Sequence, residues 1–476
     1  MKYILIIITL ICTSSCFGQY HFDKTKISKK IEEIIKRIKD VNQVMGNAVY
    51  YEGIKPPQYD NFIELRNKAT QKELLELTNH PNGVVRCYAF WALSYIQSVD
   101  LLPVIIKHID DDEFVSTQFG CIRDEEKVGD FFINCINSDV RKLSVSESKY
   151  LDSILIYTPN QLYAKEDAID RAELTESFYK RVRELVIKEK NQSALVAIAK
   201  YKREQDVSLI LNNKNDYYTY QAMALFPHPD FLPFLQNKLI ETLGDDHFDS
   251  AWRGMYATIA SYKNDKALEL LQIPFTQVKH KHIQKYHMEF IFGALEKFYS
   301  PIYEPLLWRM WEDENLVDLQ NFKILYYKNA EKAFELAKKT IENADDFYYT
   351  KVRLDKTDEK SPDLLEIMLD SILARNRFVA IELINKNIRG INVHHFPIFA
   401  NKALQLKEKV FITSLLDRLE KETNPYIYLK ATETLIAFQD KSINKQILEI
   451  YKRNKSLQTG WGGENFAELL KKHKIE

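Results

Sequence analysis

The sequence has 476 residues, a formal net charge of −1, and only 13 glycines and 14 prolines. These two residue types together make up about 6% of the chain, against a usual share of roughly 12%. Sandwiches, barrels and dinucleotide-binding folds need glycine for tight turns and close backbone approach, so the composition disfavours them. The near-zero charge gives no sign of a nucleic-acid partner, because domains that bind nucleic acid are usually strongly basic. A hydrophobic content of 45% is too high for a disordered chain.

The N-terminus has the pattern of an export signal. Lys2 precedes an apolar run of ten residues, 3–12, and polar residues follow it. Such a run is typical of a secretory signal peptide and is too short to span a membrane. We therefore expect residues 1–18 to be a signal peptide, and we expect no transmembrane span after it.

Two ways of processing this signal remain open. In the first, cleavage occurs between Gly18 and Gln19, and the mature chain is soluble. In the second, residues 13–16 form a loose lipobox in which Cys16 carries a lipid anchor, although Thr13 stands where an aliphatic residue is usual. The protein is accordingly expected to be exported, as a periplasmic or secreted protein or as an outer-membrane lipoprotein.

Helical spacing of apolar residues dominates the next part of the chain. Residues 27–45 carry isoleucine and valine at steps of three and four, which predicts one amphipathic helix. Thr70 is an N-cap with Glu73 as its capping-box partner. The helix that they start leads to a turn at 80–83, because a proline disfavours the helical conformation of the residue before it.

The segment 74–93, LLELTNHPNGVVRCYAFWAL, resembles a HEAT repeat. In that family a leucine-rich helix leads through a polar turn to a second helix that begins with Val-Arg, as Val85-Arg86 do here. Residues 101–115, LLPVIIKHIDDDEFV, resemble the next unit, although Ser116 stands where the family has arginine. The resemblance implies a superhelical stack of antiparallel helix pairs. It implies no chemistry, because the residues that the family shares pack the stack.

Further first helices are predicted to begin near residues 230, 266, 302, 331, 362, 408 and 441. Their spacing of 29 to 46 residues lies in the range that indicates a solenoid. Second helices are predicted within 247–262 and 425–438. A TPR array is the alternative, but it keeps a closer 34-residue period with a glycine in its first helix, and this chain does neither.

The predicted fold is therefore all-α, an α-solenoid of stacked antiparallel helix pairs with HEAT-like repeats. Residues 162–190 read as one long charged helix, and residues 345–361 as a loop. After the glycines at 460–463 we expect a short helix, 464–472, with Trp461 covering the last apolar face. The predicted segments are a signal peptide (1–18), an N-terminal helix and linker (19–58), a HEAT-like N-terminal array (59–137), an irregular joint with a long helix (138–200), a HEAT-like C-terminal array (201–459) and a C-terminal cap (460–476).

The cysteines and histidines do not have metal-site spacing. Cys87, Cys121 and Cys135 lie in helical apolar patterns without a CxxC motif and are interpreted as small core residues. A Cys121–Cys135 disulfide remains an alternative in an oxidising compartment.

Among the histidines, His280 and His287 share a helix face that His282 does not, and no carboxylate completes a site. We interpret this segment as a basic, solvated helix face, and His394-His395 as a loop pair with diverging side chains. The acidic residues 110–113 lack the alternation and glycine of a calcium loop and are interpreted as a turn at a helix N-terminus. Asp245 and Asp246 are interpreted as helix N-cap residues after a helix stop at Gly244.

No catalytic, phosphate-binding or dinucleotide-binding motif occurs. We accordingly predict no catalytic residue, no metal and no cofactor. The expected function is a non-enzymatic protein- or peptide-binding scaffold of the bacterial cell envelope or the secreted space. This expectation rests on the extended groove that stacked repeats present and is an analogy from the fold. The alternative is an enzyme, or the accessory domain of an enzyme, that acts on envelope or extracellular material.

Overall fold

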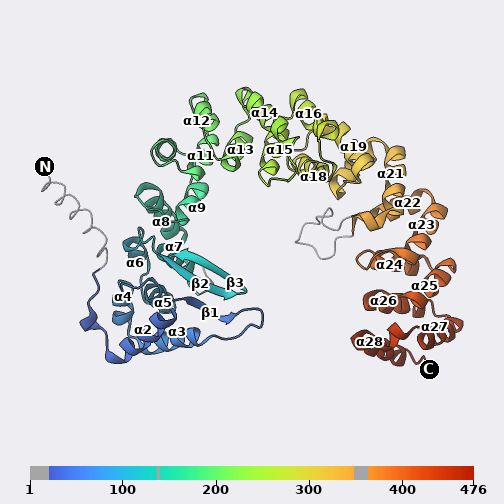
Figure 1. Cartoon of the computed structure of the whole chain (residues 1–476), viewed down its shortest axis with the longest axis horizontal. Helices are drawn as coiled ribbons and strands as arrows, with labels where there is room; N and C mark the ends of the chain where they lie inside the picture. Colours follow the sequence, from blue (N-terminus) through green and yellow to red (C-terminus); the bar gives the residue numbers. More distant parts are fainter. Residues whose placement is uncertain (1–20, 137–139, 348–362, 476) are drawn as a thin grey trace. The chain divides into compact units, whose positions relative to one another are not determined.

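The computed structural model describes residues 21–136, 140–347 and 363–475. The protein is mostly helical, as predicted, and contacts divide it into two compact units, Met1–Phe226 and Pro227–Glu476 (Figure 1). The predicted joint at 138–200 lies within the first unit.

The first unit contains twelve described α-helices and a sheet. Its helices are α2 (Lys29–Val41), α3 (Pro57–Lys68), α4 (Gln71–Leu77), α5 (Gly83–Ser94), α6 (Leu102–Lys107), α7 (Val128–Cys135), α8 (Val145–Tyr157), α9 (Ala164–Arg171), α10 (Glu176–Glu184), α11 (Gln192–Ala199), α12 (Val207–Leu211) and α13 (Asp216–Leu225), with a π-turn at Leu185–Glu189 after α10. Its strands are β1 (Val44–Val49), β2 (Phe114–Gly120) and β3 (Ile122–Lys127).

The described part of the second unit is helical. Its helices are α14 (Leu232–Thr242), α15 (Trp252–Ser261), α16 (Asp265–Gln272), α17 (Pro274–Gln277), α18 (Lys281–Lys297), α19 (Glu304–Glu314), α20 (Leu319–Lys328), α21 (Ala330–Glu342), α22 (Leu364–Arg375), α23 (Arg377–Gly390), α24 (Phe396–Leu406), α25 (Val410–Lys421), α26 (Pro425–Ile436), α27 (Lys441–Arg453) and α28 (Gly460–Lys472). Short 3-10 turns of the two units lie at Lys24–Lys26, Glu204–Asp206, Pro229–Phe231, Pro301–Tyr303, Ala344–Asp346 and Lys455–Gln458.

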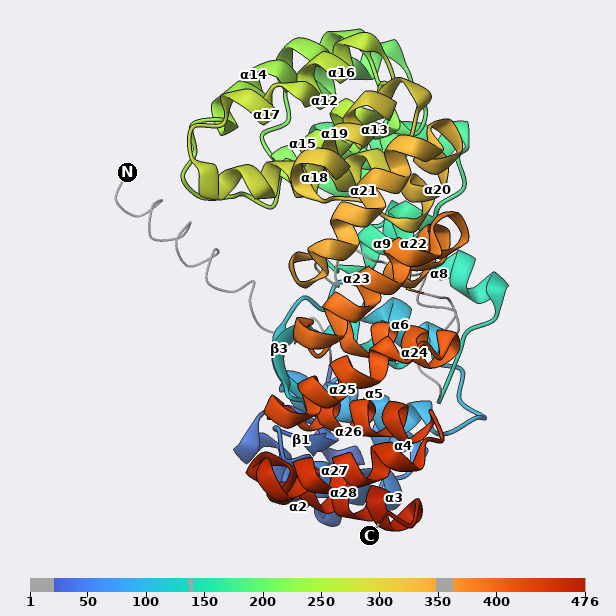
Figure 2. The same ribbon diagram turned by 90° about the vertical axis from the view of Figure 1, so that its right-hand side faces the viewer.

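Most helices of the second unit pack against their near neighbours along the chain. Contacts join α15 to α18, α18 to α19, α20 to α21, α21 to α22, α22 to α23 and α23 to α25. Figure 2 shows α22 to α28 following one another in chain order. All seven predicted first helices of this region are helices, as are the two predicted second helices. The core is accordingly a series of local interfaces.

The predicted capping box is confirmed. The side chain of Thr70 accepts a hydrogen bond from the backbone N–H of Glu73, and the Glu73 carboxylate accepts one from the backbone N–H of Thr70. The turn at 80–83 follows, and Asn82 caps α5 through Val85 N–H. Residues 70–94 thus form the predicted pair of helices.

A three-stranded sheet in the first unit was not predicted. Its order is β1-β2-β3, with β1 parallel to β2 and β2 antiparallel to β3. Where the HEAT-like pattern predicted a second helix after the acidic turn, residues 114–120 form β2 instead. Gly46 is needed at the β1–β2 contact, because a Cβ there would lie 2.8 Å from the Phe119 ring.

The predicted helix at 27–45 is shorter than expected. The stripe Ile31, Ile34, Ile35 and Ile38 is buried, but the helix ends at Val41. Asn42 adopts a left-handed conformation with φ of 51°, which turns the chain from α2 into β1. Apolar spacing alone did not detect this stop.

The predicted long helix at 162–190 is wrong. The chain leaves the helical conformation after Arg171, and α10 starts at Glu176. Thr175 is the cause of the new start, because its hydroxyl accepts a hydrogen bond from Phe178 N–H as an N-cap. In a segment rich in charged residues, a polar N-cap such as Thr175 cannot be distinguished from an ordinary surface residue of a continuous helix.

The C-terminal glycines lie inside α28 and not before it. A Cβ on Gly462 would lie 2.0 Å from Tyr428 Oη, so the missing side chain allows α28 to approach α26. Phe466, and not Trp461, covers the apolar face: it is fully buried and stacks on Tyr451 with ring centroids 5.3 Å apart. Trp461 is half exposed.

Candidate functional site

The processing residues Cys16, Gly18 and Gln19 lie outside the described residues. The predicted loop at 345–361 also lies almost entirely outside them. Within the described ranges, no helix has both the length and the apolar character that crossing a bilayer requires.

The three histidines of α18 do not share an environment. His280 precedes the helix, and His282 Nε2 donates a hydrogen bond to Asp246 O at 3.0 Å. His287 is fully buried, stacks on Trp252 and lies 2.5 Å from Tyr256 Oη through its Nδ1. The prediction of a solvated face is therefore wrong for His287, because α18 packs this side against α15.

Burial lowers the pKa of His287 to about 4. In the unfolded chain this histidine has its ordinary pKa of 6.5. Between pH 6.5 and 4 it is therefore protonated in the unfolded chain and unprotonated in the folded chain. Its contribution to the stability of the fold accordingly decreases as the pH falls through that window. We expect His287→Gln to flatten the dependence of the unfolding midpoint on pH between 6.5 and 4. Thermal denaturation of both chains across this range checks it, and parallel pH curves would contradict the assignment.

The other predicted clusters do not assemble a metal site. His395 is buried and lies 2.9 Å from Phe347 O through its Nε2, whereas His394 is exposed. Asp246 lies beside His247 and caps no helix; Asp249 accepts the hydrogen bond from Ala251 N–H before α15. No group of three or more histidine, cysteine, aspartate or glutamate side chains in the described ranges is placed to hold a metal ion.

The cysteines divide into two environments. Cys87 and Cys135 are buried on α5 and α7, which pack together, and burial raises the pKa of both thiols. Cys121 is exposed at the turn between β2 and β3, so its predicted helical environment is wrong. Among the described residues no disulfide is formed, and the Cys121–Cys135 bridge is not present.

A buried ionic cluster lies at the base of the β2–β3 hairpin. Arg86 of α5 donates to both carboxylate oxygens of Asp111, at 2.9 and 3.0 Å, and to Glu113 at 2.5 Å. Burial opposes its charge, but the two carboxylates outweigh burial and raise the pKa of Arg86. Glu113 also accepts a hydrogen bond from Gly83 N–H, the first residue of α5. The prediction of an inter-helix turn is therefore wrong: the acidic residues lead into β2, and the helix N-terminus that Glu113 contacts is that of α5, earlier in the chain.

His108 completes this cluster without forming a catalytic site. Its Nδ1 lies 3.2 Å from Asp111 Oδ2, a histidine–aspartate arrangement known from catalytic triads. Both side chains are buried, and Arg86 already binds both oxygens of Asp111. Burial lowers the pKa of His108 despite the nearby carboxylate. The cluster therefore holds the turn before β2 against α5.

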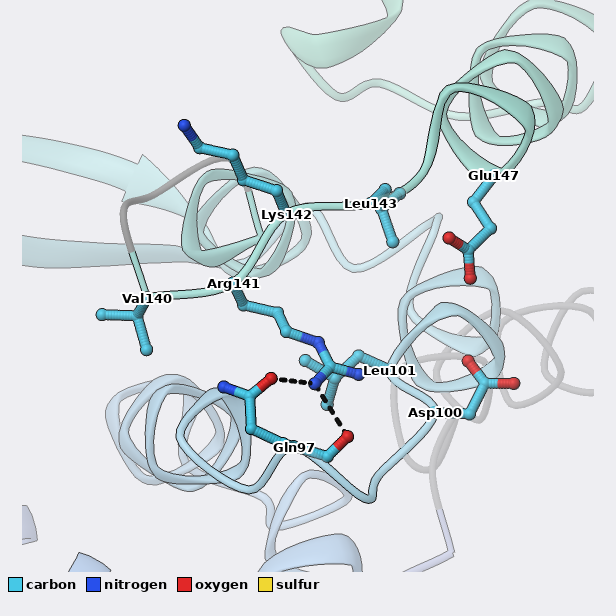
Figure 3. A pocket seen from close by; sticks show the side chains of 8 residues that line it. All are labelled: Gln97, Asp100, Leu101, Val140, Arg141, Lys142, Leu143 and Glu147. Atoms are coloured by element: carbon cyan, nitrogen blue, oxygen red, sulfur yellow. Dashed lines mark hydrogen bonds between the residues drawn. The ribbon is translucent and has the colours of Figure 1, made fainter.

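Two cavities are small or shallow and polar. The first, about 180 Å³, lies where the segment before α6 meets the segment before α8 (Figure 3). Arg141 spans it by donating to the side-chain and main-chain oxygens of Gln97 at 2.8 and 2.9 Å. The second, about 520 Å³, is lined by Arg389, Asp417, Arg418, Lys421 and Glu422. Neither lining includes a serine, cysteine or histidine, so neither holds a serine or cysteine nucleophile beside a histidine base.

The hairpin has a fixed base. Val128 N–H donates to Glu113 O at 3.0 Å and Gly129 N–H donates to Asp111 O at 2.9 Å, so both ends of the hairpin are joined beside the ionic cluster. Lys127 donates to Gln161 O, and its ammonium lies 4.4 Å from the centre of the Tyr163 ring. The hairpin is thereby attached to α5 and to the segment before α9.

The tip of the hairpin joins a second loop. Gly120, with φ of +59°, makes the two-residue turn after Phe119. Tyr50 N–H donates to Gly120 O at 2.9 Å, and Val49 and Ile54 form an antiparallel bridge. The turn at 120–121 and the loop at 50–54 are therefore held side by side.

This junction exposes large apolar side chains. Tyr51 is 93% exposed, Ile122 71%, Ile54 54%, Tyr50 52% and Phe119 42%. We call these five residues the tip patch. Single exposed apolar residues are ordinary, but a group of them gathered on two hydrogen-bonded turns is a candidate interaction surface. The tip patch is the candidate functional site.

Sequence reasoning missed this site, although one signal was present. Residues 114–119, FVSTQF, are rich in β-branched and aromatic types, and Gly120 follows them as a turn residue. The helical pattern on either side led to a helix assignment instead. The contact with the loop at 50–54 has no sequence signal, since it joins residues about seventy positions apart.

Comparison with known proteins identifies no relative: no family model and no curated protein matches this chain.

Proposed function

We propose that this protein is a non-enzymatic scaffold of the bacterial cell envelope or secreted space, and that it binds a protein or peptide through the tip patch. The observation that carries the proposal is the group of five exposed apolar side chains, two on a hairpin whose base is fixed and three on the loop bound to its tip. Aromatic and aliphatic side chains on a backbone that is already ordered can be buried against a partner with little loss of conformational entropy.

The helical part of the molecule fits the same role. The local packing along the second unit supports an α-solenoid of helix pairs, in which each repeat contacts its neighbours and an extended surface stays open. The signal-like residues 1–18 support export, with Gly18 and Gln19 at the cleavage site or Cys16 as a lipid attachment site. On this proposal the sheet is an insertion into a helical scaffold, and it carries part of the tip patch through which the partner binds.

The test is affinity capture from envelope extract with matched baits. The triple variant Tyr51→Ser, Ile54→Ser, Ile122→Ser should recover at least tenfold less of a partner than the unchanged chain does, because serine removes the apolar anchors. Quantitative mass spectrometry of the eluates measures the loss.

The matched control replaces three exposed apolar residues outside the patch, namely Val145→Ser, Tyr327→Ser and Phe378→Ser. This control should retain the partner. Equal partner recovery by the patch variant and the unchanged chain would remove the tip patch from the proposal.

A further inference from the structure

The two edges of the sheet differ in the hydrogen-bond partners of their backbone N–H and C=O groups. At β1, Met45 N–H donates to Tyr88 Oη at 2.8 Å, and Gln58 Nε2 donates to Gln43 O at 2.9 Å. Both partner side chains come from helices, α5 and α3. Beyond them, Val49 is bridged to Ile54. The β1 edge is thus already occupied.

The β3 edge is open. In the described part of the chain, β3 pairs with β2 alone and ends the sheet order (Figure 1). Its first four residues, 122–125, are exposed. An edge strand presents outward-facing N–H and C=O groups that can pair with another extended chain. The tip patch lies at the start of this same strand, because Ile122 belongs to both.

We propose that β3 binds an extended segment of the partner as a fourth strand of the sheet. This inference rests on the proposed function and specifies the partner that the tip patch takes. Main-chain hydrogen bonds to β3 give the affinity, and side chains on alternate sides give the specificity, as in other cases of strand addition. The apolar tip then anchors one end of the added strand.

The charges on β3 define the chemistry of that segment. Ile122, Asp124 and Glu126 point to one face of the sheet, and Arg123, Glu125 and Lys127 to the other. Lys127 is already bound to Gln161 O, and Asn134 donates to Glu126 at 2.5 Å. Asp124 Oδ1 accepts a hydrogen bond from Glu125 N–H at 2.8 Å, so Asp124 offers its other carboxylate oxygen on one face, and Glu125 offers its carboxylate on the other. The partner segment carries an apolar residue beside Ile122 and two adjacent basic residues beside these carboxylates.

A second copy of this chain is the rival occupant. A parallel, in-register pairing of two β3 strands places Asp124 and Glu125 each opposite itself, and like charges directly opposite one another destabilise a strand pair. The antiparallel register that places Glu125 opposite itself also places Asp124 opposite Glu126 and Arg123 opposite Lys127. An antiparallel register that places Arg123 opposite Glu125 brings opposite charges together, so the measurement of dimerisation by sedimentation distinguishes a second copy from a basic foreign segment.

The test starts from a displayed library of random dodecapeptides selected on the immobilised full chain. We expect the enriched peptides to alternate apolar and polar residues and to carry two adjacent lysines or arginines. Each enriched peptide is then synthesised and N-methylated at every second residue, in the two alternate phases. One phase should bind at least tenfold more weakly in calorimetry and the other less than threefold, because only every second N–H faces β3.

Charge reversal supplies the second measurement. We expect Asp124→Lys with Glu125→Lys to weaken the basic peptides at least tenfold. Glu464→Lys with Glu468→Lys, the same charge change at exposed positions of α28, should leave binding unchanged. Circular dichroism checks that both chains are folded, and the N-methylation result does not depend on any variant.

The outcomes separate this inference from the proposed function. Equal affinity of both N-methylated phases would overturn strand addition and leave side-chain docking on the tip patch in place. If no enriched peptide binds the charge-reversal variant more weakly, the occupant is not a basic segment. A dimer that sedimentation detects and the charge reversal alters would point to a second copy instead. Failure of the proposed function is a separate result, namely unchanged partner recovery by the tip-patch variant.

Discussion

Replacement of Arg86 by alanine should destabilise the first unit by roughly 3–5 kcal/mol, the usual cost of removing one partner of a buried ion pair. The arginine side chain is 4% exposed and the Asp111 side chain 3%. Without the guanidinium, Asp111 keeps a buried carboxylate beside His108, and the carbonyl oxygens of His80 and Pro81 also lose a donor. Hydrogen-exchange protection of α5 and β2 measures the loss.

Two further variants serve as controls for the loss of the buried ion pair. Arg171→Ala removes a surface ion pair with Asp152 and should cost less than about 1 kcal/mol. The double replacement Arg86→Ala, Asp111→Ala should be more stable than Arg86→Ala alone, because no carboxylate is then left buried. An Arg86→Ala chain as stable as Arg171→Ala would mean that the ionic cluster does not hold the base of the hairpin.

Ala92→Asp should unfold the first unit. Ala92 is completely buried on α5, a helix that packs against α3 and α7. A carboxylate there has neither solvent nor a partner, and the expected cost is on the order of 4 kcal/mol or more. Circular dichroism and thermal denaturation of the full chain measure it, and an unchanged melting curve would contradict the placement of this helix.

The charge can be separated from the change in size. Ala92→Asn has nearly the same volume without the charge and should cost less than Ala92→Asp at neutral pH. Because burial raises the pKa of a carboxyl group, the difference between the two variants should shrink as pH falls. Ala330→Asp, at an exposed position at the start of α21, should change stability by less than about 0.5 kcal/mol, since an acid is favourable near a helix N-terminus.

The helices could be predicted because their signals are local. Thr70 and Glu73 form a capping box within four residues, and the isoleucine stripe of α2 repeats within one helix. Each needs only near neighbours to be recognised. The boundaries failed where one residue redirects the backbone, as at Asn42 and Thr175.

The sheet and the candidate site could not be predicted in the same way. β1 pairs with β2 across about seventy residues, so neither its existence nor its parallel direction follows from the residues 44–49 themselves. The exposure of Tyr51 and Ile54 depends on a turn that is closed by the Val49–Ile54 bridge and attached to the hairpin by the bond between Tyr50 and Gly120. The acidic run on β3 reads as an ordinary charged surface until the strand order shows that it lies at an open edge.

The parallel pairing of β1 and β2 also has a consequence for the order of folding. The β2–β3 hairpin closes a two-residue loop and forms on a fast, local time scale, whereas β1 must wait until the chain from α3 to α6 brings its two ends together. We therefore expect β1 to join the sheet after the hairpin has formed, and the loop that carries Tyr50, Tyr51 and Ile54 to become ordered with it. In this order of events the tip patch is complete only after the longer loop has closed.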